Sequence, residues 1–262
     1  MGSLQALLLG LIGGLTDIFP VSSSGHRLLA GQMLFGSPYD RTFTGACELA
    51  SALAALVALR REVGSILGSL RVAGSEGRQV GLLLLAAALP AALLSLPFRD
   101  ASVEVSRNLG GVGVLLLVSG LLLYVAEELG RRSRPLTSLS VPGAILVGLL
   151  QVLAVLPGVS RMGFAISGAM LAGITREAAT RFALLLSIPL LLFTGLWDLS
   201  YSEPGGSPAG AGDFALGMAA SFAAAYAAVR LLLLFVHRFS LMTFAYYLWG
   251  VGLVTIVYVT LR

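Results

Sequence analysis

The sequence has one cysteine, no lysine and few charged residues. Cys47 cannot form an internal disulfide, and in its apolar surroundings we expect it to pack as a small hydrophobic residue, so redox chemistry is excluded. All seventeen basic residues are arginine, and with thirteen acidic residues they give a net charge of +4. Because these arginines occur in short loops rather than in one stripe, nucleic-acid binding is excluded. Arginine suits phosphate binding, although codon bias explains its exclusive use at least as well.

Targeting signals are also missing from the first residues, MGSLQALLLG. They lack the basic segment of a signal peptide, and Ala6 takes the place of the hydroxyl residue in a myristoylation signal. We therefore expect the N-terminus to be retained.

Apolar residues are the most abundant class in the chain. They make up 57% of the chain, charged residues only 11%, and the mean hydropathy is +0.92. Several nearly uncharged stretches of about 20 residues are long enough, at about 1.5 Å per residue, to cross about 30 Å of hydrocarbon. The sequence therefore predicts an all-α polytopic membrane protein.

Apolar runs and helix breakers divide the chain into two kinds of segment. Two regions, about 3–36 and 139–173, are apolar but interrupted, the first by Pro20 with serines and the second by Pro157 and Gly158. Because neither half of either region is long enough to span, we expect two re-entrant helix pairs. Six full transmembrane helices are predicted at roughly 42–62, 78–98, 108–130, 177–198, 211–236 and 240–261.

Loop charges indicate the orientation in the membrane. With re-entrant pairs, one face carries Arg60, Arg61, Arg71, Arg78, Arg131, Arg132, Arg134, Arg176, Arg230 and Arg238. The other carries Asp40, Asp100, Glu104, Asp198, Glu203 and Asp213. The positive-inside rule makes the first face cytoplasmic. We therefore expect a multi-pass plasma-membrane protein with both termini and the active site facing outside.

The two halves of the chain resemble each other. A shift of 138 residues aligns GLIGGLTDIFPVSSSGH (10–26) with GLLQVLAVLPGVSRMGF (148–164), with six identities in seventeen positions. Residues 1–137 and 138–262 would then each hold one re-entrant pair and three spans. Because three is odd, the second repeat is inverted, and both breaks meet near the bilayer midplane.

The breaks carry groups suited to an anion. Pro20 ends one half-helix, and the serines after it are good N-caps for the next. Such a helix start presents free N–H groups and a positive dipole end. Ser160 and Arg161 do the same in the second repeat, and Arg161 adds a fixed charge that can bind two phosphate oxygens. Close helix packing by small residues is the alternative, but buried charged residues favour an anion site.

Four further residues have open roles. His26, on the same face as Ser23, suits proton transfer with Asp17 orienting it or binding a divalent ion, or it is an interfacial histidine. Glu48 is a metal or proton ligand, or it pairs with an arginine such as Arg41. Arg181 follows Glu177 by four residues, which suits a helical ion pair as well as phosphate contact.

Both break sequences and the segment EAATRFALLLSIPLLL resemble the undecaprenyl-pyrophosphate phosphatase family of bacitracin-resistance type, over essentially the whole chain. The resemblance implies six spans plus two re-entrant pairs in inverted repeat. It also implies hydrolysis of a polyprenyl pyrophosphate to the monophosphate and phosphate on the outer side, usually with a divalent cation such as Mg or Ca. This chain departs from the family at Gly13, where an acid or glutamine is usual, and at Asp17, usually glutamate. It also departs at Met162 to Ala165, where two hydroxyls are lost.

The resemblance and the break chemistry together give candidate roles. Ser23 is the expected nucleophile, with His26 and Asp17 as further catalytic residues. Asp17 and Glu48 are the expected metal ligands. The expected partners are the polyprenyl pyrophosphate lipid and the bilayer, and a homodimer stays open. A transporter or flippase of polyprenyl phosphates is the alternative function, because inverted repeats with broken helices are typical of transporters. The expected substrate-binding residues are Ser22, Ser24, Gly25, Gly158, Ser160, Arg161 and Arg181.

Overall fold

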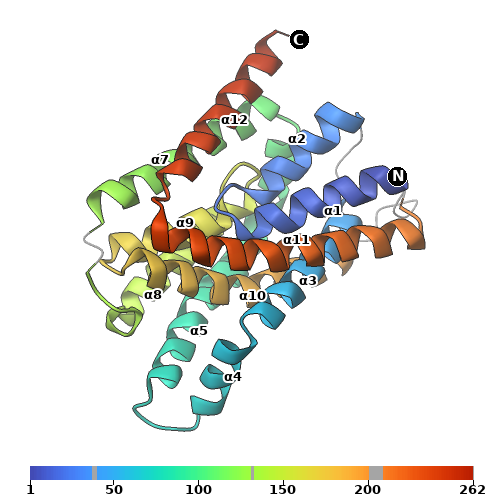
Figure 1. Cartoon of the computed structure of the whole chain (residues 1–262). Helices are drawn as coiled ribbons and strands as arrows, with labels where there is room; N and C mark the ends of the chain where they lie inside the picture. Colours follow the sequence, from blue (N-terminus) through green and yellow to red (C-terminus); the bar gives the residue numbers. More distant parts are fainter. Residues whose placement is uncertain (37–39, 131–132, 201–208, 262) are drawn as a thin grey trace.

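The computed structural model describes residues 1–36, 40–130, 133–200 and 209–261. These residues form a bundle of α-helices with short 3-10 segments between some of them (Figure 1). The first half contains α1 (Ser3–Ile18), α2 (Ser23–Phe35), α3 (Arg41–Ala58), α4 (Arg60–Ser69), α5 (Glu76–Ser95), α6 (Arg99–Ser106) and α7 (Leu109–Leu129). The second half contains α8 (Val141–Val152), α9 (Arg161–Leu171), α10 (Arg176–Ser200), α11 (Ala211–Arg238) and α12 (Met242–Thr260). The 3-10 segments are η1 (Leu96–Phe98), η2 (Leu136–Ser138) and η3 (Leu153–Val155).

Five helices are long and apolar enough to cross a membrane, namely α5 (extended by η1), α7, α10, α11 and α12, and each coincides with a predicted span. The sixth prediction, 42–62, is correct in place but not in shape. Helix α3 ends at Ala58, and α4 continues at an angle of 76°. The bend comes where the apolar run meets Arg60 and Arg61, whose exposed side chains turn away from the bundle.

The two interrupted regions form helix pairs, as the sequence predicts. Helix α1 has 16 residues and α8 has 12, so at about 1.5 Å per residue neither reaches across about 30 Å of hydrocarbon. Each is followed, after a polar break, by a second short helix, α2 or α9. The fold is therefore an all-helical membrane protein with six candidate spans and two broken segments.

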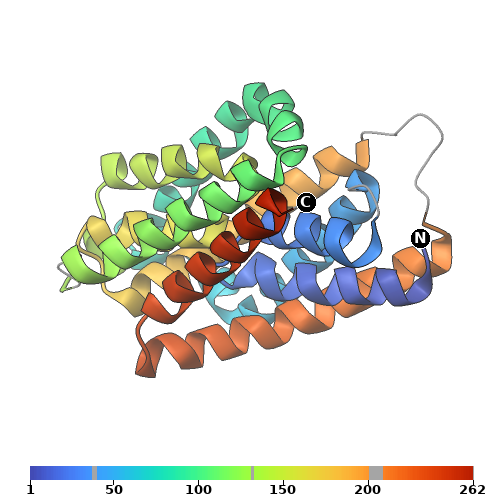
Figure 2. The same cartoon turned by 90° about the horizontal axis from the view of Figure 1, so that it is seen from above.

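The broken segments exchange packing partners between the halves. Helix α1 lies along α11, as Figures 1 and 2 both show, while α8 lies along α5. Glycine allows each close approach, because a Cβ at Gly10 would lie 2.4 Å from the Gly217 carbonyl oxygen and one at Gly148 would lie 2.3 Å from that of Ala87. Gly10 and Gly148 are equivalent under the 138-residue shift. In each half, the first helix thus packs on a helix of the other half, as an inverted duplication predicts. The duplication itself remains a prediction.

The chain ends lie on one side of the bundle. In Figure 1 the N- and C-termini are toward the upper right, and the loop between α4 and α5 is at the lower left. This arrangement agrees with an even number of spans. Assignment of the terminal side to the outside remains a prediction from loop charge. Of the charges used for it, Arg131, Arg132 and Glu203 lie outside the described residues, as does the side chain of Asp100.

Candidate active site

The two polar breaks touch each other inside the bundle. Helix α1 ends at Ile18, and α2 begins at Ser23 with Ser22 as its N-cap. Ser22 has a positive φ of 71°, which is rare for a residue with a side chain and is typical of functional sites. Its Oγ accepts hydrogen bonds from the N–H of Gly25 (3.4 Å) and, across the interface, from the N–H of Gly158 (3.2 Å). One hydroxyl therefore joins the first break to the second.

The second break has the same capping pattern. Gly158 has φ of 102°, a conformation that favours glycine. Ser160 caps α9, and its Oγ accepts a hydrogen bond from the N–H of Gly163 at 3.1 Å. Ser119 on α7 fixes the turn, because its Oγ accepts from the Ser160 N–H (3.0 Å) and donates to the Gly158 carbonyl (3.0 Å). Both half-helices thus begin at the predicted positions and are held rigidly.

A cavity of about 680 Å³ opens beside the paired breaks. It is lined from the first break by Asp17 and Ser22 to Ser24, and from the second by Val159 to Met162. Helices α3, α5, α6 and α10 complete its wall. The hydroxyl of Ser23 is buried in this wall beside the Asp17 carboxylate and, among the described residues, has no partner at ordinary hydrogen-bond geometry. A buried hydroxyl without a partner is costly unless a ligand satisfies it.

The starts of α2 and α9 offer further donors to the cavity. The capping bonds satisfy the N–H groups of Gly25, His26, Gly163 and Phe164. Within the described part of the chain, the earlier N–H groups of each helix have no protein acceptor. Free N–H groups at the positive end of a helix dipole bind anions.

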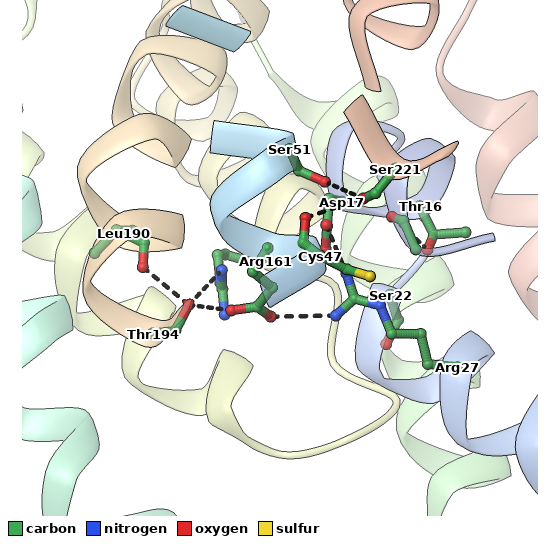
Figure 3. Close-up of polar contacts among 12 residues, drawn as sticks. Thr16, Asp17, Ser22, Arg27, Cys47, Ser51, Arg161, Leu190, Thr194 and Ser221 are labelled. Atoms are coloured by element: carbon green, nitrogen blue, oxygen red, sulfur yellow. Dashed lines mark hydrogen bonds and ion pairs between the residues drawn. The ribbon is translucent and has the colours of Figure 1, made fainter. Parts of the chain in front are cut away.

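Arg161 lies between the second break and helix α10. Its Nη1 is 3.5 Å from the Oγ1 of Thr194, and the same hydroxyl bonds the Oε2 of Glu48 and the carbonyl of Leu190. Figure 3 shows this row of contacts. Arg161 is therefore oriented from one side, and its charge faces the cavity that it lines.

A buried ion cluster lies behind the first break. Arg27, on the second turn of α2, is 5% exposed. Its Nη2 donates to Oδ2 of Asp17 at 2.6 Å, and its Nη1 donates to Oε1 of Glu48 at 3.3 Å. Glu48 thus pairs with an arginine, as one alternative held, but with Arg27 rather than Arg41. The cluster links α1, α2 and α3 (Figure 3).

Most of the predicted site residues come together. The wall of the cavity contains Asp17, Ser22, Ser23, Ser24, Glu48, Ser160 and Arg161. Gly25 and Gly158 lie in the break contact behind it, where a Cβ on Gly25 would be 3.1 Å from the Gly158 nitrogen. They shape the turns rather than line the cavity.

His26 is not among the residues that line the cavity. Its Nδ1 lies 2.9 Å from the Ser22 carbonyl oxygen, and its Nε2 lies 2.8 Å from the hydroxyl of Tyr247, with which its ring stacks. Both ring nitrogens are therefore engaged. The geometry does not support the predicted direct role in proton transfer, and it fits a residue that anchors the first turn of α2 to α12.

The structure places Arg181, a predicted substrate-binding residue, outside the cavity lining. Its guanidinium pairs with Glu62 at 3.1 Å, and both side chains are about half exposed. Thr194, on the same helix, lines the cavity. Their separation of thirteen positions corresponds to about 20 Å along the helix axis. Arg181 also does not pair with Glu177, which bonds His237 instead.

The two predicted metal ligands, Asp17 and Glu48, are already occupied by an arginine. Mg²⁺ is usually held by one or two carboxylates together with substrate phosphate oxygens, whereas Ca²⁺ takes six to eight oxygen donors. Among the described residues, no group of three or more histidine, cysteine, aspartate or glutamate side chains comes close enough to hold a metal. Asp17 and Glu48 are instead bound by Arg27 on one side, and Glu48 is bound by Thr194 on the other.

Several site residues were not predicted. Arg27 follows the first motif directly, and the need of buried Asp17 for a counter-ion was a signal that pointed to it. Gln151 donates to the Arg161 carbonyl at 3.0 Å, and its Oε1 is buried without a hydrogen-bond partner among the described residues. It occupies the position equivalent to Gly13 under the 138-residue shift, which is a second usable signal. For Thr194 the sequence contains no signal.

Comparison with known proteins identifies relatives over the whole chain. The family described as bacitracin resistance protein BacA matches residues 6–254. The undecaprenyl-diphosphatase of Micrococcus luteus is 36% identical over 255 residues, which cover 93% of this chain and 92% of the relative. Those of Thermobifida fusca (34% identical, 99% of this chain and 91% of the relative) and a Nocardioides species (35%, 98% and 96%) are similar.

Proposed function

Because the chain belongs to the BacA family of bacitracin resistance proteins, we propose that it is an undecaprenyl-diphosphatase. It hydrolyses undecaprenyl diphosphate to the monophosphate and inorganic phosphate, and so recycles the lipid carrier of envelope glycan synthesis. One observation carries the proposal at the level of chemistry. The unpartnered Ser23 hydroxyl and the Arg161 guanidinium line one cavity at two helix starts that touch.

The diphosphate binds between the two helix starts. Free N–H groups of α2 and α9 and the guanidinium of Arg161 contact the terminal phosphate, because together they supply donors and positive charge at one place. Gln151, Ser24 and Ser160 line the same space. Charge stabilisation and positioning of this kind supply most of the rate in phosphoryl transfer.

Ser23 Oγ then attacks the terminal phosphorus. The bond to the bridging oxygen breaks, undecaprenyl monophosphate leaves with the electron pair, and the serine proton passes to Asp17, whose carboxylate lines the same cavity. A water next attacks the phosphoserine, the P–Oγ bond breaks, and Asp17 returns its proton to Ser23. The protons of the water leave with the inorganic phosphate.

The lipid tail stays in the hydrocarbon. The cavity wall turns apolar at Ala91 and Ala92 of α5 and at Leu190 and Phe193 of α10, and a prenyl chain fits such a surface through the hydrophobic effect. The prenyl chain follows this apolar wall toward the lipid, and the diphosphate alone enters the polar part.

Phosphate release by purified protein tests the proposal. We expect release from a polyprenyl diphosphate in detergent, and Ser23→Ala should lower it at least about a thousandfold. Binding of a non-hydrolysable methylene diphosphonate lipid should survive in that variant. Ser69→Ala is the matched control, because the Ser69 hydroxyl donates to the Ser65 carbonyl of the same helix, α4, and lies outside the cavity. Movement of labelled polyprenyl phosphate across vesicles without phosphate release would favour the transporter alternative.

We also propose that the cavity faces the outside, because α6 and the start of α3 line it on the side with fewer arginine loops. Cysteine labelling tests this. Arg107→Cys at the cavity mouth should react with an impermeant maleimide in intact cells, and Arg71→Cys in the opposite loop should not. Native Cys47 is 1% exposed, so background labelling is low. The reverse pattern would place the cavity on the cytoplasmic side.

A further inference from the structure

Arg27 occupies the place between the two carboxylates that a cation would take. Its guanidinium contacts Asp17 and Glu48, which come from α1 and α3, and the side chains of all three are less than 10% exposed. An arginine remains charged at every accessible pH. The pair of acids therefore already has a permanent counter-ion built into the chain.

The Arg27 side chain packs against Gly13 of α1. A Cβ at Gly13 would lie 2.5 Å from Arg27 Nε and 3.0 Å from its Nη2, so the arginine side chain lies directly on the glycine. Any side chain at this position would displace it. Gly13 is also the position where the sequence departs from the acid or glutamine of the first motif. The Arg27 side chain thus fills the space that a side chain at position 13 would occupy.

Arg27 also orients the phosphate-binding arginine indirectly. It bonds one oxygen of Glu48, the other oxygen bonds Thr194, and Thr194 bonds Arg161. Figure 3 shows Arg27, Thr194 and Arg161 of this row, and Arg161 also lines the cavity. Removing the charge of Arg27 would therefore change the position of Arg161 through Glu48 and Thr194.

The charge balance of the site is positive without any added ion. Arg41, Arg107 and Arg161 line the cavity and Arg27 lies behind it, against the acids Asp17, Glu48 and Asp198. We propose, on the basis of the phosphatase function above, that Arg27 replaces a divalent cation. Hydrolysis then proceeds without a metal held by Asp17 and Glu48, and Arg27 acts as a positioning residue through these two acids.

The first test uses the wild-type protein. Phosphate release from a polyprenyl diphosphate is measured in EDTA and again with excess magnesium. We expect the two rates to agree within about twofold, whereas a metal-dependent phosphatase loses most of its rate in EDTA. A fall of more than about tenfold in EDTA that magnesium reverses would overturn the inference.

The second test measures metal binding without substrate, by electron paramagnetic resonance of added Mn²⁺. Wild type and Glu48→Gln should bind the same amount. Arg27→Met should gain one bound ion, which Asp17→Asn/Arg27→Met should lose again, and Arg71→Met is the matched arginine control. A bound ion in wild type that Glu48→Gln loses would contradict the inference.

These measurements separate the two proposals. If no phosphate is released in EDTA or in magnesium, the phosphatase function fails, and the Mn²⁺ comparison still decides whether Arg27 takes the place of the cation. If Arg27→Met does not fold, the comparison of wild type with Glu48→Gln decides alone.

Discussion

The two polar breaks share a scaffold but carry different chemistry. In both, a serine caps the second half-helix and bonds the N–H of a glycine three residues later, Ser22 with Gly25 and Ser160 with Gly163. Directly after the cap, however, the first break has Ser23 and the second has Arg161. The common part satisfies buried backbone groups, as a lipid environment demands. In the mechanism that we propose, the differing part divides the reaction, with the nucleophile on one break and the phosphate-binding charge on the other.

The charges around the breaks differ as well. The first break is backed by Asp17, Arg27 and Glu48, whereas under the 138-residue shift Val155 stands where Asp17 does and Ala165 where Arg27 does. The second break thus shows that the capping scaffold does not need an ion cluster to form. We infer that the ion cluster serves the chemistry of the first break, and the variants below test this inference.

The largest expected effect is on stability. Arg27→Met leaves two buried carboxylates without a counter-ion, which we expect to lower the free energy of unfolding by about 3–5 kcal/mol. The triple variant Asp17→Asn/Arg27→Met/Glu48→Gln makes the first break neutral like the second, and we expect it to recover most of that loss. Thermal unfolding in detergent measures both. Equal destabilisation of the triple variant would mean that the scaffold itself depends on the cluster.

A smaller effect is expected at the second break. Arg161→Lys keeps the charge but loses the planar fork that binds two phosphate oxygens, so kcat/KM should fall by about 10–100-fold. For Arg161→Met, kcat/KM should fall further. Thermal stability should change little, because Arg161 is only partly buried. Steady-state phosphate release checks both, with Arg71→Met as the control. An unchanged rate in Arg161→Met would remove this residue from the site.

The smallest expected effect separates the two caps. Ser160→Ala removes one capping bond and should cost about 1 kcal/mol of stability. Ser22→Ala removes the equivalent bond and also the bond to the Gly158 N–H, so we expect it to cost about 1 kcal/mol more. Equal losses in the two variants would show that the contact between the breaks contributes nothing. Unfolding midpoints of the two variants provide the comparison.

Local rules predicted the breaks well. Pro20 and the serines locate the start of α2, and Ser160 locates that of α9, because capping depends on residues close in sequence. The likeness between the halves predicted that the breaks meet, and the bond from Gly158 to Ser22 is that contact. Hydropathy located the five apolar helices and the bent pair of α3 and α4 for the same reason, since membrane burial acts on each helix separately.

Side-chain partners could not be predicted in this way. Spacing placed His26 on the face of Ser23, but Tyr247 of α12, 221 positions away, bonds its ring outside the cavity wall. Glu48 could have paired with several arginines, and Arg27 is selected because α1 packs against both α2 and α3 and so brings the two side chains together. Arg181 was assigned by residue type, and Glu62 on α4 meets it because α3 bends at Leu59. Each choice depends on how distant helices pack.

The oxygen of Ser22 is an acceptor for one N–H from each half of the protein. Because the second of these comes from Gly158, the contact between the breaks cannot form until synthesis and membrane insertion have passed that residue. Only then can Ser23, the proposed nucleophile, and Arg161 line one cavity. In the proposed mechanism, the first half alone therefore lacks a complete site, which forms only when the second break packs against the first.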